Sequence, residues 1–188
     1  MTRWFEWLFK PSRMAMGSLL LIGLGFGAFS VIAFNVTMDA TNTEAFCTSC
    51  HEMAAGPGAL IKDTTHFANA SGVRPTCSDC HVPKEFFPKM WRKIQASREV
   101  WGALTGIIDT DEKYLAHVAT MKAREVDRMR SNDSQECRNC HDVEHMIFAD
   151  QSAKAREFHR VMASEAKTCI DCHQGIAHMT PEVAERLP

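Results

Sequence analysis

The chain has 188 residues and a formal net charge of −2, with 21 basic side chains against 23 acidic ones. This balance argues against a nucleic-acid-binding protein, which would carry an excess of basic residues, and the length is that of about one domain. Eight cysteines and nine histidines in so short a chain point instead to sites built from these two side chains.

Residues 14–38 form an apolar segment that follows a short basic N-terminus, residues 1–13. The segment has 25 residues without a charged side chain, and a membrane-spanning helix needs about 20. Three basic residues precede it, and positively charged flanks stay in the cytoplasm. We therefore predict a cytoplasmic N-terminus, a transmembrane helix and an outer domain over residues 39–188.

A cleaved secretory signal is the alternative for this segment. Such signals have an apolar region of about 7 to 15 residues followed by a small-residue cleavage site. The segment here is longer and lacks an A-x-A site, so we expect the helix to be retained. Gly23 and Gly27 form a G-x-x-x-G step that can bring two membrane helices together. This suggests a homodimer, although glycine is also ordinarily tolerated in membrane helices.

All eight cysteines fall into four C-x-x-C-H motifs, and none is left over. In this motif both sulfurs form thioethers with a haem and the histidine reaches the iron. A zinc site needs no histidine directly after every second cysteine, and a disulfide framework needs none at all. We therefore predict four covalently bound haem c groups. The cysteines are Cys47, Cys50, Cys77, Cys80, Cys137, Cys140, Cys169 and Cys172, and the motif histidines are His51, His81, His141 and His173.

The motifs are unevenly spaced and form two pairs. The first cysteines of successive motifs are 30, 60 and 32 residues apart, and each pair encloses one further histidine, His66 or His159. This spacing suggests two duplicated di-haem halves.

The outer domain is predicted to be mainly α, with short helices and loops packed around the haems. A chain this short buries only a modest apolar core, so haem edges should supply much of it. Helical spacing of apolar residues predicts a helix over Pro88–Leu104. A second helix is predicted over Asp111–Arg130, where dense charges of both signs are typical of a solvated face. No segment alternates as a strand would.

Five histidines lie outside the motifs, and each haem iron needs a second axial ligand. His66, His159 and His178 are the attractive ligands, and His178 is too close to His173 to serve the same haem. His117 and His145 are more typical of solvated histidines. Three ligands for four haems leave one haem short, and Met53, two residues after His51, carries a thioether that can also bind iron.

The chain resembles the NapC/NirT family of membrane-anchored tetrahaem quinol dehydrogenases, over essentially its whole length. The resemblance rests on "FKPS" in the basic N-terminus, one apolar segment, the four motifs in this layout, and the sequences "NDSQECRNCH" and "TCIDCHQGIAH". It implies a single-pass protein of the bacterial inner membrane with its haem domain in the periplasm.

The resemblance also implies a ligand for each iron. It gives His178 to the second haem, His159 to the third and His66 to the fourth. The first haem, close to the membrane beside a quinol pocket, is left with Met53 or His51. Met53 can equally be apolar packing, since methionine fills irregular gaps.

Two residues on the helix after the second motif are the implied catalytic residues. Lys93 is placed to bind the quinol, and Glu99 stands where the relatives carry an aspartate. The extra methylene puts its direct contact in question. Both can also be charges on an exposed helix face.

The function implied is oxidation of a membrane quinol, menaquinol or ubiquinol, with electrons passed to a periplasmic reductase, most similar to the members that supply nitrate reductase. Membrane lipid is a further expected partner, and nucleic acid is not. The alternative is an electron-relay or docking subunit for another periplasmic reductase without its own quinol site. A terminal reductase is disfavoured because the chain shows no additional catalytic domain.

Overall fold

The computed structural model describes residues 14–162 and 164–178, and within these ranges the chain is helical without strands. The predicted cytoplasmic segment, 1–13, lies outside the described residues. The chain divides into two units, residues 1–41 and 42–188, and each is described by itself.

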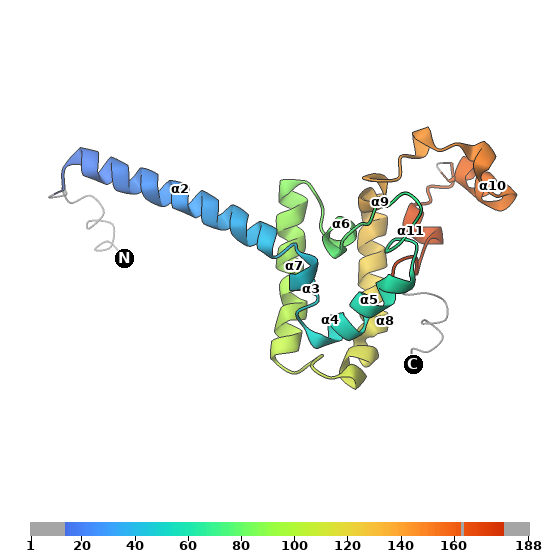
Figure 1. Cartoon of the computed structure of the whole chain (residues 1–188), viewed down its shortest axis with the longest axis horizontal. Helices are drawn as coiled ribbons and strands as arrows, with labels where there is room; N and C mark the ends of the chain where they lie inside the picture. Colours follow the sequence, from blue (N-terminus) through green and yellow to red (C-terminus); the bar gives the residue numbers. More distant parts are fainter. Residues whose placement is uncertain (1–13, 163, 179–188) are drawn as a thin grey trace. The chain divides into compact units, whose positions relative to one another are not determined.

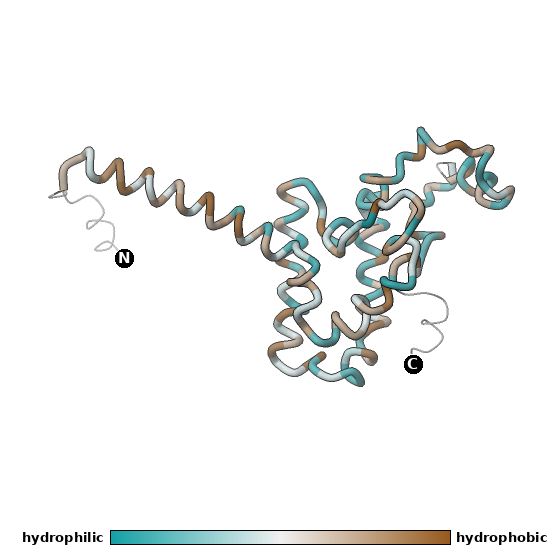
Figure 2. Tube along the Cα trace, viewed as in Figure 1, coloured by the Kyte–Doolittle hydropathy of each residue, from teal (hydrophilic) through white to brown (hydrophobic). Residues whose placement is uncertain are grey.

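The described residues of the first unit form the helix α2 (Met16–Ala40), which lies two residues later than the predicted span. It is long and apolar enough to cross a membrane, and Figure 2 shows apolar residues along its length. Its polar side chains are satisfied within the helix. Ser30 Oγ donates to the Phe26 carbonyl at 2.8 Å and Thr37 Oγ1 to the Ala33 carbonyl at 2.7 Å, which suits a helix in hydrocarbon.

The second unit contains two long helices joined to a set of short ones (Figure 1). The long helices are α7 (Phe86–Leu104) and α8 (Asp111–Ser131). The short α-helices are α3 (Glu44–Cys47), α4 (His51–Ala55), α5 (Pro57–Leu60), α6 (Cys77–His81), α9 (Gln135–Arg138), α10 (Ala153–Val161) and α11 (Cys169–Cys172), and the 3₁₀ turns are η1 (Ile61–Asp63), η2 (Val143–His145) and η3 (Phe148–Asp150).

Both predicted long helices are confirmed, with small changes at their ends. α7 begins before Pro88 because a proline in the first turn lacks only an N–H that has no partner there. The Thr110 side chain accepts a hydrogen bond from the Lys113 N–H at the start of α8. Asp111 lies in the first turn of α8 and Arg128 in the last, which complements the helix dipole.

The second unit has very little apolar core of its own. Among the described residues, the buried hydrophobic side chains are Val118 and Met129, whereas Glu52, Ser134 and Glu136 are buried although they are polar. A polypeptide of this size normally encloses far more apolar surface. The scarcity agrees with the prediction that bound haems complete the core.

Candidate functional site

Each C-x-x-C-H motif begins in or at the end of a short helix. The second motif of each pair shares the sequence T-C-x-D-C-H and the same capping arrangement. Asp79 accepts a hydrogen bond from the Thr76 N–H at 2.8 Å, and Asp171 accepts one from the Thr168 N–H at 2.8 Å. The hydrogen bond from Thr168, together with Arg130, lowers the pKa of Asp171 to about 2. The local repeat is real, while duplication of whole halves stays a prediction.

The four motifs follow one another in space in the order of the sequence. The Cys47 and Cys77 thiols lie within hydrogen-bonding reach, which lowers the pKa of Cys47 to about 6 and raises that of Cys77. Burial, with Cys137 nearby, raises the pKa of Cys80 to about 11, and α6 packs on α9. Burial, with Cys169 nearby, raises the pKa of Cys137. Because haem attachment converts these thiols to thioethers, the shifts serve only to show which sulfurs are neighbours.

The alternatives to haem find no support in these cysteines. All eight have free thiols, so no disulfide framework is present. The described part of the chain contains no group of three or more His, Cys, Asp or Glu side chains arranged to hold a metal ion by themselves.

Three motif histidines each face a second imidazole from elsewhere in the chain. The ring centroids are 5.8 Å apart for His81 and His178, and 6.2 Å apart for His66 and His141. They are 5.9 Å apart for His159 and His173. These separations fit two imidazoles on opposite sides of one iron, since each metal–nitrogen bond is about 2 Å long and half of each ring lies beyond it. The residues present therefore fit three bis-imidazole haems.

The pairing differs in one respect from what the resemblance implies. His178 lies beside the second motif, as expected, but His66 lies beside the third motif and His159 beside the fourth. The two expected assignments are exchanged. The helix that carries His159, α10, is followed in the chain by α11 and the fourth motif. The loop that carries His66 lies close to Ile176, since His66 Nδ1 is 3.3 Å from the Ile176 carbonyl.

The outer nitrogens of these imidazoles have different acceptors. His81 Nδ1 is 2.8 Å from Glu125 Oε1, and His159 Nδ1 is 2.8 Å from Gln151 Oε1. A hydrogen bond at Nδ1 fixes the tautomer and leaves Nε2 for a metal. Burial lowers the pKa of His178 to about 4, so this imidazole is neutral, the form that a metal binds.

The first motif is built differently from the other three. His51 is 63% exposed, its Nε2 lies 3.4 Å from Glu52 Oε1, and no second imidazole faces it within the described residues. Met53 is on the same short helix, α4, and is 36% exposed. The assignment of Met53 or His51 to the first haem stays a prediction.

The two remaining spare histidines are not brought to any motif histidine. His145 is 82% exposed and its Nδ1 contacts Asp142 at 2.7 Å. His117 is exposed on α8 and its Nδ1 lies 2.7 Å from the Lys113 carbonyl. Both fit the expectation for solvated histidines.

The two predicted catalytic residues lie on α7. Lys93 is half-buried and close to Cys47 of the first motif. Burial lowers the pKa of Lys93, and the nearby Cys47 charge offsets only part of this shift. The Glu99 side chain has a buried oxygen, Oε2, without a hydrogen-bond partner among the described residues. A buried carboxylate oxygen left without a partner is costly and calls for a ligand or a proton.

A charged cluster on α8 was not anticipated, and the expectation of a purely solvated face is wrong here. Glu125 contacts Arg92 of α7 at 3.5 Å and Arg128 at 2.8 Å, and Arg128 reaches Glu136 at 2.7 Å. Burial raises the pKa of Glu125, but the hydrogen bonds from His81 and Arg128 outweigh it, so the pKa is lowered. Nothing in the sequence alone marks Glu125 as buried, because its charge is typical of an exposed helix face.

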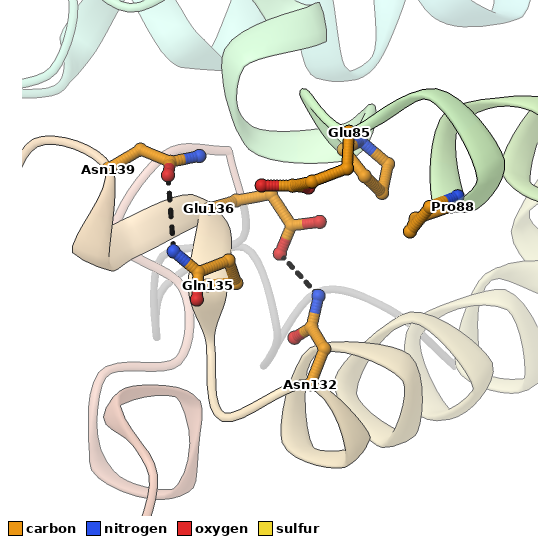
Figure 3. A pocket seen from close by; sticks show the side chains of 7 residues that line it. Glu85, Pro88, Asn132, Gln135, Glu136 and Asn139 are labelled. Carbon is orange, nitrogen blue, oxygen red and sulfur yellow. Dashed lines mark hydrogen bonds between the residues drawn. The ribbon is translucent and has the colours of Figure 1, made fainter.

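A hollow of about 250 Å³ lies next to this cluster, lined by Pro83, Glu85, Pro88, Asn132, Gln135, Glu136 and Asn139 (Figure 3). Within it Asn132 Nδ2 donates to Glu136 Oε2 at 2.9 Å, and Gln135 Nε2 donates to Asn139 Oδ1 at 3.2 Å. It contains none of the predicted site residues.

Four C-x-x-C-H motifs with three facing imidazole pairs define the chain as a tetrahaem c-type cytochrome. More particularly, the chain belongs to the NapC/NirT cytochrome c family, because the model for the N-terminal region of that family matches residues 10–183. With its one apolar N-terminal helix, it is a membrane-anchored electron-transfer protein carrying four covalent haem c groups.

Several relatives are similar over most of their length. The chain is 48% identical to "Cytochrome c-type protein NapC" of Escherichia coli K12, over 97% of this chain and 92% of the relative. It is 48% identical to "Denitrification system component NirT" of Stutzerimonas stutzeri, over 92% and 87% respectively. A tetraheme cytochrome-c type protein of Allochromatium vinosum is 43% identical, over 87% and 90%. No solved structure matches the chain.

Proposed function

We propose that this cytochrome oxidises a membrane quinol at its first motif and passes the electrons to a periplasmic reductase, with nitrate reductase as the expected acceptor. The observation that carries the proposal is the difference at the first motif, where no second imidazole faces His51 within the described residues and the half-buried Lys93 lies near Cys47. The orientation follows from the basic N-terminal flank, which stays in the cytoplasm.

The length of the connector between the units supports a quinol site at the membrane surface. α2 ends at Ala40 and α3 begins at Glu44, and three extended residues reach at most about 11 Å. The first motif begins at Cys47, only seven residues after α2. So short a stretch of chain between the apolar span and the first motif favours this motif as the one that meets a quinol diffusing in the bilayer.

An exposed apolar surface on α7 also supports contact with lipid. Its members recur at helical spacing on one face of α7, and we call them the α7 stripe: Phe87, Trp91, Ile94, Trp101 and Leu104. Phe87 is 81% and Leu104 78% exposed. Tryptophan is enriched where protein meets a membrane–water interface, and an exposed apolar surface of this kind marks an interaction site. Lys93 lies along one edge of the stripe.

Oxidation of a quinol to a quinone releases two protons and two electrons, and the site must accept both. The haem groups supply one-electron acceptance. Lys93 Nζ can donate a hydrogen bond to a quinol oxygen and stabilise the negative charge that develops as its proton leaves. The Glu99 carboxylate, whose Oε2 has no hydrogen-bond partner among the described residues, is the candidate acceptor for that proton.

The spatial order of the motifs supports a single route from the first motif to the fourth. Each motif neighbours only the next one among the cysteine contacts described above. The fourth motif then lies at the far end of the series from the quinol, where a soluble acceptor would dock.

The test is reduction of the purified protein by a quinol analogue. We expect Lys93→Gln to slow this reduction about 10- to 100-fold, since a hydrogen bond to a charged group contributes about 1.5–3 kcal/mol, while the haem content stays at four. Lys154→Gln, an exposed lysine on α10, is the matched control and should reduce at the normal rate.

The alternative, a relay without its own quinol site, makes a different prediction. In that case no quinol analogue would reduce the unmodified protein, although dithionite would. Full quinol activity in Lys93→Gln would instead show that Lys93 is not part of the quinol site.

A further inference from the structure

The carboxylate of Glu125 sets one imidazole apart from the other haem ligands. His81 Nδ1 lies 2.8 Å from Glu125 Oε1. His159 has a neutral amide oxygen at the same position, from Gln151 at 2.8 Å, and His66 has a backbone carbonyl, from Ile176 at 3.3 Å. Of the six imidazoles in the three facing pairs, only His81 has a carboxylate on Nδ1 within the described residues.

The Glu125 carboxylate is held firmly in this position. Arg128 donates to Oε1 through Nε at 3.1 Å and Nη2 at 2.8 Å, and Arg92 Nη2 lies 3.5 Å from Oε2. Both arginines also bind the second motif itself, since Arg92 donates to the His81 carbonyl at 3.2 Å and Arg128 to the Cys80 carbonyl at 3.3 Å. The Glu125 side chain is only 22% exposed, so water competes little for it.

We propose that Glu125 is a positioning and tuning residue for the second haem, which it shifts to a lower reduction potential through His81. An imidazole bound to iron through Nε2 carries a proton on Nδ1 and donates it. An anionic acceptor pulls on that proton, which makes the imidazole a stronger electron donor to the iron and so favours the oxidised iron. Charge-assisted hydrogen bonds are about twice as strong as neutral ones.

The surrounding charges add to the same effect. Arg92, Glu125, Arg128 and Glu136 form a cluster with two positive and two negative charges. Replacing Glu125 by a neutral group leaves one uncompensated positive charge next to the second motif, which favours the reduced iron further. Both effects of the replacement therefore raise the potential.

The experiment is a redox titration with mediators and dithionite, followed by electron paramagnetic resonance. The second haem is identified as the low-spin signal lost in His178→Ala. In Glu125→Gln we expect its equilibrium to move about tenfold towards reduction, which corresponds to about 59 mV for one electron. The signals of the other haems should move much less.

Two matched variants separate the hydrogen bond from the charge. Glu136→Gln removes one carboxylate from the same cluster without touching His81, so its shift should be clearly smaller. Gln151→Glu places a carboxylate on His159 Nδ1 in the same geometry, so the potential of the haem at the fourth motif should fall. If Glu125→Gln assembles with fewer than four haems, Glu125→Asp is titrated in its place. This variant keeps the negative charge but moves the carboxylate oxygen away from His81 Nδ1, so the potential of its second haem tests the hydrogen bond.

The proposal is overturned if the second haem keeps its potential, moves in the opposite direction, or moves equally in Glu136→Gln. It rests on the pairing of His81 with His178 and not on the proposed quinol oxidation. Because dithionite sets the potential, failure of the quinol reaction would leave this test unaffected.

Discussion

The first motif and the third motif show two ways of using the same five-residue pattern. His141 of the third motif faces His66 at a ring separation of 6.2 Å, whereas His51 of the first motif is exposed and faces no imidazole among the described residues. The pattern attaches a haem in both places, but the surroundings decide what the iron can do. Paired imidazoles suit a relay, and under the proposed function the first motif, with Lys93 near Cys47, is the point where electrons enter.

The largest expected effect comes from making the third motif resemble the first. In His66→Ala the third haem loses its second imidazole, so one bis-imidazole low-spin signal should disappear completely from the magnetic resonance spectrum. His117→Ala, which removes an exposed histidine of α8, is the control and should leave all signals in place. Loss of the signal of the fourth haem instead would restore the assignment that the resemblance implies.

A smaller effect sharpens the difference at the first motif. If Met53 binds the first iron, Met53→Leu removes a thioether ligand while keeping the apolar bulk, so one haem signal should change in spin state or potential. Optical and magnetic spectra of the same preparation measure it. Spectra identical to those of the unmodified protein would leave His51 as the ligand and Met53 as packing.

The smallest effect concerns the link between the third and fourth motifs. Ser134 is completely buried, and its hydroxyl accepts a hydrogen bond from the Ile170 N–H at 3.2 Å. Ser134→Ala leaves that N–H without its partner, so we expect a loss of about 1–3 kcal/mol in the free energy of unfolding. Denaturant unfolding of the haem-loaded protein measures this, and unchanged stability would contradict it. Residue 134 keeps its backbone φ of 52° in this variant, so a change in backbone strain does not contribute to the difference in stability between Ser134→Ala and the unmodified protein.

Much of the fold could be predicted because it depends on local signals. Cysteine spacing identified every motif, helical periodicity of apolar residues located α7, and a segment dense in charges of both signs located α8, each within two residues at its ends. Proline and charge patterns act over one or two turns, so a sequence reveals them directly.

The pairing of ligands could not be predicted in the same way. His66 and His141 are 75 residues apart, and nothing local tells which motif the loop after η1 will approach. Glu125 was missed for a related reason. Its charge is typical of an exposed helix face, and only the approach of α6 turns it into the partner of His81.

The near absence of buried apolar side chains has a consequence for how the protein is made. Ordering a backbone costs about 1–2 kcal/mol for each residue. Val118 and Met129, the buried hydrophobic side chains among the described residues, cannot offset that cost for residues 42–162 and 164–178. We therefore expect attachment of the porphyrins and folding of this unit to be coupled, as in small domains that are unfolded without their metal. A failure of maturation would then lower the stability of the polypeptide and expose it to proteolysis.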